Sequence, residues 1–243
     1  MTTNVYDSKT GVMATDSRWS HMFGSRILYA DDLAYSKIEL YKSSAFMFAG
    51  DGEMIQSWKD WISSSPTDAS AMPGYDGVCV CVVDIPSKAV RFKQPQDITK
   101  DGGYFAGSGS MHAYLCWSVN GDAKQAVTSA SLSDPFSGGV VRHIDLNDMS
   151  GNLDHGPVTK QRIDDVRTAV LERGMVMTIA HNAAPFPLSK LAANDVEVAN
   201  VRDAIARGEI SPAAPCDGMY TEWTEEQKTE LKGVLADIFG WQS

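Results

Sequence analysis

The stretch NVYDSKTGVMAT at residues 4–15 indicates the fold most directly. Two short runs, residues 4–7 and 12–15, are separated by turn-like residues 8–11, which end in a glycine. Two runs of strand-forming residues around a short polar loop with a glycine are typical of a β-hairpin. The sequence therefore predicts that two adjacent antiparallel strands form close to Thr2 and Thr3.

The residues that follow this hairpin predict an α+β chain. Short apolar or alternating runs indicate strands, and apolar residues at helical spacing indicate helices. Strands are expected at residues 27–30, 33–40, 44–49, 78–83, 89–92, 104–106 and 140–146. Helices are expected at residues 54–62, 111–119 and 123–132. Residues 63–77 are rich in Ser, Pro, Gly and Asp, which is typical of a loop. Grouped helices between strand pairs place the helices outside the sheets.

The last part of the chain, from about residue 159, has a mostly helical pattern. Thr224 and Gln227 fit a capping box at the start of the last expected helix. The expected helices are residues 162–173, 196–207 and 224–239, with loops at Pro185, Pro187, Pro212 and Pro215. We therefore expect a core of residues 1–158 and a C-terminal extension of residues 159–243 that packs on the core.

Composition and charge exclude several classes of protein. Of the 243 residues, 43% are apolar and 21% are charged, which is ordinary for a soluble globular protein. The formal net charge is −10, and an acidic surface repels phosphate backbones, so no nucleic acid partner is expected. No apolar run approaches the ~20 residues that cross a bilayer, so no membrane partner is expected. The first residues lack the basic and apolar segments of a secretory signal, and we expect a cytoplasmic protein.

The cysteines and histidines show no pattern of metal ligands. Cys79 and Cys81 alternate in an apolar run, which places both on one face of a strand as buried small residues and leaves little room for a metal or disulfide role. The other cysteines and the histidines are scattered without ligand spacing: Cys116, Cys216, His21, His112, His143, His155 and His181. No metal site is expected.

Four separated segments carry the residues that indicate a chemistry. A small hydroxyl residue follows the initiator methionine, a lysine follows a tyrosine and a serine, and two later segments combine glycines with serines. In order, the segments are Met1-Thr2-Thr3 with GVMATDSR at 11–18, YSKI at 35–38 with Phe48-Ala49-Gly50, GSGS at 107–110, and DPFSGG at 134–139. Each segment alone is a weak signal, but their order and spacing together are specific.

Over about residues 2–146, this set resembles the N-terminal-nucleophile (Ntn) hydrolase superfamily. Within it, the pattern is most similar to proteasome β subunits, to the HslV-type peptidase and to divergent bacterial proteasome homologues. The resemblance implies a four-layer αββα sandwich of two antiparallel sheets, here with a helical C-terminal extension. It also implies a threonine peptidase that needs neither a metal nor an organic cofactor.

The resemblance assigns a role to each residue of the expected site. After removal of Met1, Thr2 is the nucleophile and its own α-amine is the general base, because an α-amine has a pKa of ~7.7–8.0, near working pH. Lys37 favours the ionised hydroxyl, and Asp16, which Arg18 supports, compensates the lysine charge. Gly50 provides an oxyanion N–H. The last group, which positions the amine, is Ser108, Asp134 and Ser137.

The same resemblance implies a substrate wall and an assembly. Trp19 and Phe48 are expected to line the substrate pocket and to favour small or apolar side chains. The expected partners are further copies of the chain in a self-compartmentalising homo-oligomer, a peptide or unfolded protein as substrate, and an ATP-driven unfoldase. Residues 63–77 are too short for the second helix of proteasome β subunits, which puts six- or seven-membered rings in doubt. The extension after residue 159 also has no counterpart in the HslV-type peptidase, although divergent bacterial homologues tolerate such additions.

Two other functions fit the same residues. If Met1 is retained, Thr2 has no free amine, and the chain is a catalytically inactive binding or structural protein on the same scaffold. Alternatively, the chain is an Ntn amidase that acts on a small amide. An intact-mass measurement separates the first alternative from an enzyme, and a comparison of peptide and small-amide substrates separates the second.

Overall fold

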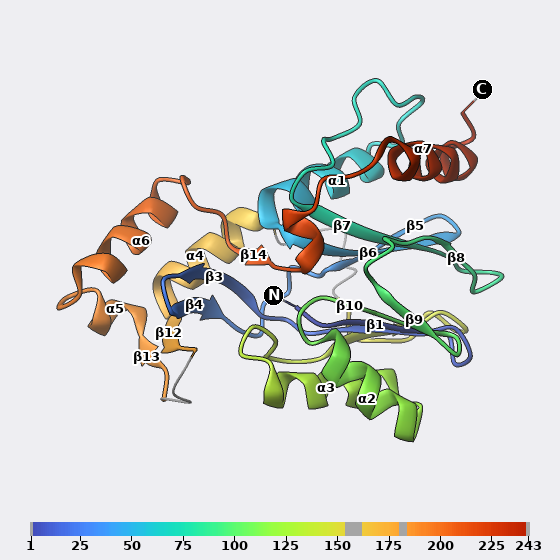
Figure 1. Cartoon of the computed structure of the whole chain (residues 1–243). Coiled ribbons are helices and arrows are strands. Elements are labelled where there is room, and N and C mark those ends of the chain that lie inside the picture. The colour runs from blue at the N-terminus through green and yellow to red at the C-terminus, as the bar shows by residue number, and fades with distance from the viewer. Residues whose placement is uncertain (1, 154–161, 180–183, 242–243) are drawn as a thin grey trace.

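The structure is a computed structural model, and it describes residues 2–153, 162–179 and 184–241. Figure 1 shows two β-sheets stacked on each other, with helices on both outer faces. All strand pairs among the described residues are antiparallel. This is the four-layer αββα arrangement expected from the sequence, and the predicted α+β fold class is confirmed.

The smaller sheet contains the predicted hairpin. In the described residues it has five strands in the order β11-β2-β1-β10-β9. Asn4 lies opposite Thr15, and Gly11 closes the turn at a φ of 77°, which glycine adopts without strain. The strands of this sheet are β1 (Asn4–Asp7), β2 (Val12–Thr15), β9 (Ile98–Lys100), β10 (Gly103–Ala106) and β11 (Arg142–Asp145).

The larger sheet has nine strands in the described residues. The order is β13-β12-β4-β3-β14-β6-β7-β8, and β5 also pairs with β6. The longest pair, β6 and β7, is buried on both faces, which explains its nearly continuous apolar sequence. The strands are β3 (Trp19–Phe23), β4 (Arg26–Ala30), β5 (Ile38–Tyr41), β6 (Ser44–Asp51), β7 (Val78–Asp84), β8 (Val90–Phe92), β12 (Met175–Thr178), β13 (Phe186–Pro187) and β14 (Ala213–Ala214).

The helices begin and end where the sequence offers capping residues. Asp51 accepts hydrogen bonds from the first amides of α1, and Gly121 ends α2 in the left-handed conformation. The helices are α1 (Gly52–Ser63), α2 (Ser110–Asn120), α3 (Ala123–Ser133), α4 (Ile163–Arg173), α5 (Leu188–Leu191), α6 (Val196–Ala206) and α7 (Glu225–Phe239), with the 3-10 helix η1 (Asp217–Tyr220). Within the described ranges, none of these helices has the length and apolar character needed to cross a membrane.

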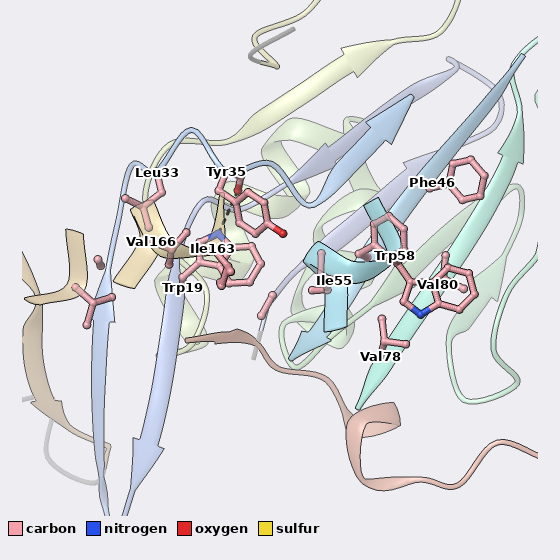
Figure 2. Packing of buried hydrophobic residues seen from close by; sticks show 14 of the residues in the cluster. Trp19, Leu33, Tyr35, Phe46, Ile55, Trp58, Val78, Val80, Ile163 and Val166 are labelled. Carbon is pink, nitrogen blue, oxygen red and sulfur yellow. Dashed lines mark hydrogen bonds between the residues drawn. The ribbon is translucent and has the colours of Figure 1, made fainter. Parts of the chain in front are cut away.

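Three apolar clusters hold the layers together. Tyr6, Met13 and Met47 belong to the cluster between the two sheets. Phe105 and Trp117 belong to the cluster between the smaller sheet and the pair α2 and α3. The largest cluster lies on the outer face of the larger sheet, where Figure 2 shows side chains of β3, β6, β7, α1 and α4 gathered together.

Several strands differ from the sequence-based expectation. β3 was not predicted, because its sequence WSHMF does not alternate, and residues 33–40 enter a strand only at Ile38. β9, β13 and β14 were also not predicted, since each has only two or three residues. β12 was not predicted because it lies in the C-terminal part, where a mostly helical pattern was expected. As expected, residues 64–77 form no helix.

The C-terminal part contributes to the sandwich in two ways. Its helices α4 to α6 pack beside the larger sheet, as Figure 1 shows, and its strands β12, β13 and β14 join that sheet. The expectation of a mostly helical extension is therefore incomplete, because β14 lies inside the sheet between β3 and β6. The proposed boundary at residues 158 and 159 lies outside the described residues and stays a prediction.

Candidate active site

The two sheets meet at one end around Thr2. Thr2 and Thr3 directly precede β1, and Asp16 directly follows β2, so the hairpin brings them together, with the Asp16 N–H 3.3 Å from the Thr3 carbonyl oxygen. Lys37 comes from the larger sheet, directly before β5. The Asn4 amide, which donates to the Phe48 carbonyl at 2.9 Å, ties the two sheets at this end.

Lys37 joins the two sheets through its ammonium group. Its Nζ lies 2.8 Å from Thr2 Oγ1 and 2.9 Å from Asp16 Oδ1. It also donates to the backbone carbonyls of Asp16 and Arg18, at 2.9 and 2.8 Å. Its side chain is 1% exposed. Burial lowers the pKa of Lys37, and the nearby Asp16 carboxylate opposes this shift.

Asp16 is held by donors on both of its oxygens. Oδ1 accepts from the Thr2 hydroxyl, from the Thr3 N–H at 2.9 Å and from Lys37. Oδ2 accepts from the N–H groups of Arg18 and Gly138, at 3.1 and 3.2 Å. A carboxylate with this many donors is fixed in position. Thr2, Asp16 and Lys37, which the sequence analysis placed together, therefore form one hydrogen-bonded group.

Arg18 supports this group differently from the expectation. Its backbone, not its guanidinium, contacts Asp16 and Lys37. The guanidinium forms a two-bond ion pair with Asp31, with both bonds at 2.7 Å, and donates to the Pro135 carbonyl at 2.6 Å. It also lies 3.8 Å from the centre of the Tyr29 ring. Arg18 therefore fastens the loop at residues 134–139 to the larger sheet.

Ser108, Asp134 and Ser137 form a second hydrogen-bonded group. Asp134 Oδ2 accepts from the hydroxyls of both serines, with a distance of 2.6 Å to Ser137 Oγ. Ser137 Oγ in turn lies 2.7 Å from Thr3 Oγ1. The three residues meet as the sequence analysis expected, and their contact to the N-terminal segment is made through Thr3. No role for Thr3 was expected from the sequence.

Gly50 lies at the end of β6, with a φ of 129°. A Cβ at this position would collide with the backbone of Gly77, so the close approach of β7 is what requires a glycine here. Phe48 donates its N–H to Lys37 O at one edge of β6, and Asp51 donates its N–H to Gly77 O at the other edge. Because the direction of backbone groups alternates along a strand, the Gly50 N–H faces the same edge as Lys37.

Trp19 and Phe48 do not line a substrate pocket. Both side chains are completely buried in the largest apolar cluster, and Figure 2 shows Trp19 beside Tyr35 and Ile163. The indole of Trp19 donates to the Tyr35 carbonyl at 3.2 Å, and its ring lies 5.6 Å from Lys37 Nζ. The expected substrate contact is therefore corrected: Trp19 supports the lysine from the core side. Both faces of the larger sheet are covered, so its strands do not alternate between apolar and polar residues. The sequence therefore could not reveal on which face of the sheet the side chains of Trp19 and Phe48 lie.

The surroundings of Thr2 contain a feature that the sequence analysis missed. Thr2 and Thr3 are fully buried, and in the larger sheet β14 pairs with β3 and with the end of β6 that carries Gly50. An open pocket of about 340 Å³ lies beside β14, lined by Ser20, Phe136 and several of residues 209–220. The two alanines of β14 stand between Pro212 and Pro215 and carry no strand pattern, so no signal in the sequence could have revealed this strand.

The cysteines agree in part with the expectation. Cys79 and Cys81 are buried in β7, as predicted, and all four thiols are free. Cys216, however, directly follows Pro215 and places its Sγ 2.6 Å from Cys79 Sγ. Contact with Cys216 and burial raise the pKa of the Cys79 thiol. Two of the histidines considered above, His155 and His181, lie outside the described residues.

Comparisons with known proteins show likeness only at the level of structure. No family model and no curated protein matches the sequence. Solved structures similar to the chain include BPH of Thiobacillus denitrificans in complex with epoxomicin, with a TM-score of 0.42, 16% identity, and coverage of 58% of this chain and 96% of that one. BPH of the same organism without the ligand has a TM-score of 0.39 and 16% identity, and the match covers 59% of this chain and 95% of that one. A eukaryotic HslV from Trypanosoma brucei has a TM-score of 0.37 and 16% identity, and the match covers 58% of this chain and 97% of that one.

Proposed function

We propose that the chain is a threonine peptidase of the Ntn hydrolase type, with Thr2 as the nucleophile. The observation that carries this proposal is the distance of 2.8 Å between Thr2 Oγ1 and Lys37 Nζ in a fully buried group. A buried ammonium in contact with a hydroxyl favours the ionised oxygen, which is the nucleophilic form. Asp16 offsets the lysine charge and fixes its position.

The proposed reaction requires that the bond before Thr2 is cleaved, and Met1 lies outside the described residues. The freed α-amine of Thr2 takes the proton from Oγ1 as this oxygen attacks the substrate carbonyl. The Gly50 N–H, which faces the edge of β6 beside Lys37, stabilises the oxyanion. The intermediate collapses to an ester on Oγ1, the amine product leaves with a proton, and water then hydrolyses the ester.

The second hydrogen-bonded group suits a positioning role in this mechanism. Ser137 and Asp134 hold Thr3 through its hydroxyl, and Asp16 accepts from the Thr3 N–H. Fixing the residue next to the nucleophile fixes the direction of the Thr2 amine and hydroxyl. A misplacement of about 1 Å at a reacting group can cost about 10²-fold in rate. We therefore propose that Thr3 aligns the nucleophile.

Self-assembly is also part of this proposal. Met111, Leu115 and Val119 stand four residues apart on α2 and are 53%, 56% and 88% exposed. Side chains at this spacing share one face of a helix. An exposed apolar stripe of this kind fits a contact between copies of the chain in a homo-oligomer. The measurement that tests this point is the mass of the native particle, and a monomer at micromolar concentration contradicts it.

The experiment that tests the activity combines intact mass with hydrolysis. We expect the mass to show loss of residue 1, and we expect a panel of fluorogenic peptides to be cleaved in preference to small amides. Thr2→Ala removes the hydroxyl and should abolish hydrolysis, while Thr2→Ser keeps a hydroxyl and should retain part of it. Epoxomicin, which BPH of Thiobacillus denitrificans binds, should add its mass to the wild type but not to Thr2→Ala.

Each outcome of this experiment points to one of the three functions. Undiminished hydrolysis by Thr2→Ala removes Thr2 from the mechanism. A mass that retains residue 1, together with no hydrolysis of any substrate, supports a non-catalytic binding protein. Preference for small amides over peptides supports an amidase at the same site.

A further inference from the structure

The strand β14 fills the gap between β3 and β6 in the larger sheet. Ala213 pairs with both Ser20 of β3 and Asp51 of β6, and Ala214 pairs with Gly50. Ala214 is fully buried. Without β14, the edges of β3 and β6 would present free backbone groups across an open groove. Such a groove accepts an extended peptide by strand addition.

The residue opposite Ala214 is the proposed oxyanion donor. The Gly50 N–H faces the edge of β6 on which β14 lies, because the Asp51 N–H already donates to Gly77 O at the opposite edge. The backbone of Ala214 therefore stands where a substrate carbonyl has to stand to use this N–H. Ala213 faces the other way in the strand, toward Ser20.

The segment after β14 covers the same end of the sandwich. Cys216 and Gly218 line a small space together with Gly107, which directly precedes Ser108. A Cβ on Gly218 would collide with Cys79, so this glycine allows the segment to lie directly on β7. The contact between the Cys79 and Cys216 sulfurs adds a second anchor. Thr2 is fully buried in this arrangement.

The strand pairing of β14 nevertheless extends over only two residues. Pro212 and Pro215 bracket the two alanines, and neither proline has an N–H with which to extend the strand pairing. An open pocket of about 340 Å³ runs along the segment and is lined by Ser20 of β3, Ala213 and Pro215. Displacement of this two-residue strand leaves the pairing of β3 with β4 and of β6 with β7 in place.

We propose that residues 211–218 are a built-in occupant of the peptide groove, and that a substrate has to displace β14 to reach Thr2. This inference rests on the proposed function for its consequence on hydrolysis, while the groove itself can be tested by binding alone. The occupant also indicates what the groove accepts: an extended backbone with small side chains at the positions of Ala213 and Ala214.

The test uses the full chain and a fluorescein-labelled peptide SPAAPS, which copies residues 211–216 with serine in place of the cysteine. Ala213→Pro removes the N–H that faces Ser20, and Ala213→Ser is the matched control that keeps it. We expect Ala213→Pro to bind the peptide at least tenfold more tightly than the wild type by fluorescence anisotropy, and Ala213→Ser to bind like the wild type. Equal binding by all three proteins overturns the inference.

A second variant and a chemical lock guard against a folding defect. If circular dichroism shows that Ala213→Pro is unfolded, Gly218→Ala displaces the segment at its other anchor and should give the same gain. In the wild type, oxidised glutathione should link Cys79 to Cys216: each thiol loses a hydrogen, and the reagent is reduced to two thiols. The linked protein should bind less peptide, and Cys216→Ser should not respond. Unchanged binding by the linked protein, or no gain for Gly218→Ala, contradicts the inference.

Hydrolysis separates this inference from the proposed function. If Ala213→Pro gains peptide binding but hydrolyses nothing, the groove is occupied as proposed and the peptidase assignment fails. If hydrolysis depends on Thr2 but neither binding nor rate rises in Ala213→Pro, the peptidase assignment stands and the role of β14 fails. When both are right, Ala213→Pro raises the rate and addition of Thr2→Ala to it abolishes hydrolysis but not binding.

Discussion

Replacement of Lys37 by methionine tests the energetic core of the candidate site. Lys37→Met keeps the length of the side chain and removes the ammonium. The ammonium lies within 2.8–2.9 Å of four oxygens, and both it and the Asp16 carboxylate are 1% exposed. Breaking a buried ion pair by removal of one partner costs about 3–5 kcal/mol, because the other charge stays buried and uncompensated.

The structure places the expected cost at the lower end of this range. Asp16 keeps its hydrogen bonds from the N–H groups of Thr3, Arg18 and Gly138 after the substitution. We therefore expect Lys37→Met to lower the free energy of unfolding by about 3 kcal/mol. With a urea m-value of about 3 kcal/mol per M, the unfolding midpoint falls by about 1 M. Tryptophan fluorescence follows this transition, since several of the six tryptophans are buried.

A double variant separates the charge from the packing. Asp16→Asn in the Lys37→Met background removes the uncompensated anion, so it should recover part of the lost stability. Hydrolysis should fall by about 10²–10³-fold in Lys37→Met, by analogy with the loss of one donor to a developing oxyanion. A loss of stability below about 1 kcal/mol would refute the argument, because it would mean that the pair is solvated and worth little.

Two further predictions concern groups near the site. Burial raises the pKa of Asp97 to about 6, although the Tyr104 hydroxyl donates to it at 2.9 Å. Between about pH 4 and pH 6 the folded state therefore holds a proton on Asp97 that the unfolded state has lost, and the free energy of unfolding falls as the pH rises through this range. Asp97→Asn should therefore be more stable than the wild type by at most about 3 kcal/mol at pH 7 and by little at pH 4, as measured by urea titration. Ser137→Ala leaves the buried Thr3 hydroxyl without its partner at 2.7 Å and should cost about 1–3 kcal/mol in thermal unfolding. If Ser137 only aligns the nucleophile, this variant lowers kcat and leaves KM unchanged.

The sequence by itself determined the hairpin, and its resemblance to a known family indicated the residues of the candidate site. Residues 4–15 are local, and a turn with Gly11 between two short strands leaves only one simple pairing. That pairing places Asp16 beside Thr3, and the match of four ordered segments placed Lys37 and the Ser108, Asp134 and Ser137 group around it. The hairpin is a local property of the sequence, whereas the site residues were indicated by the resemblance that the four segments carry together.

The tertiary structure alone decided what surrounds this site. β14 pairs with strands more than 160 residues earlier through backbone groups, which two alanines possess like any other residues, so composition and periodicity carry no trace of the pairing. The contact between Cys79 and Cys216 follows from that pairing. The orientation of Trp19 and Phe48 toward the core was hidden for a related reason. Where both faces of a sheet are covered, apolar residues occur on each face, and only the packed layers decide which face meets the helices.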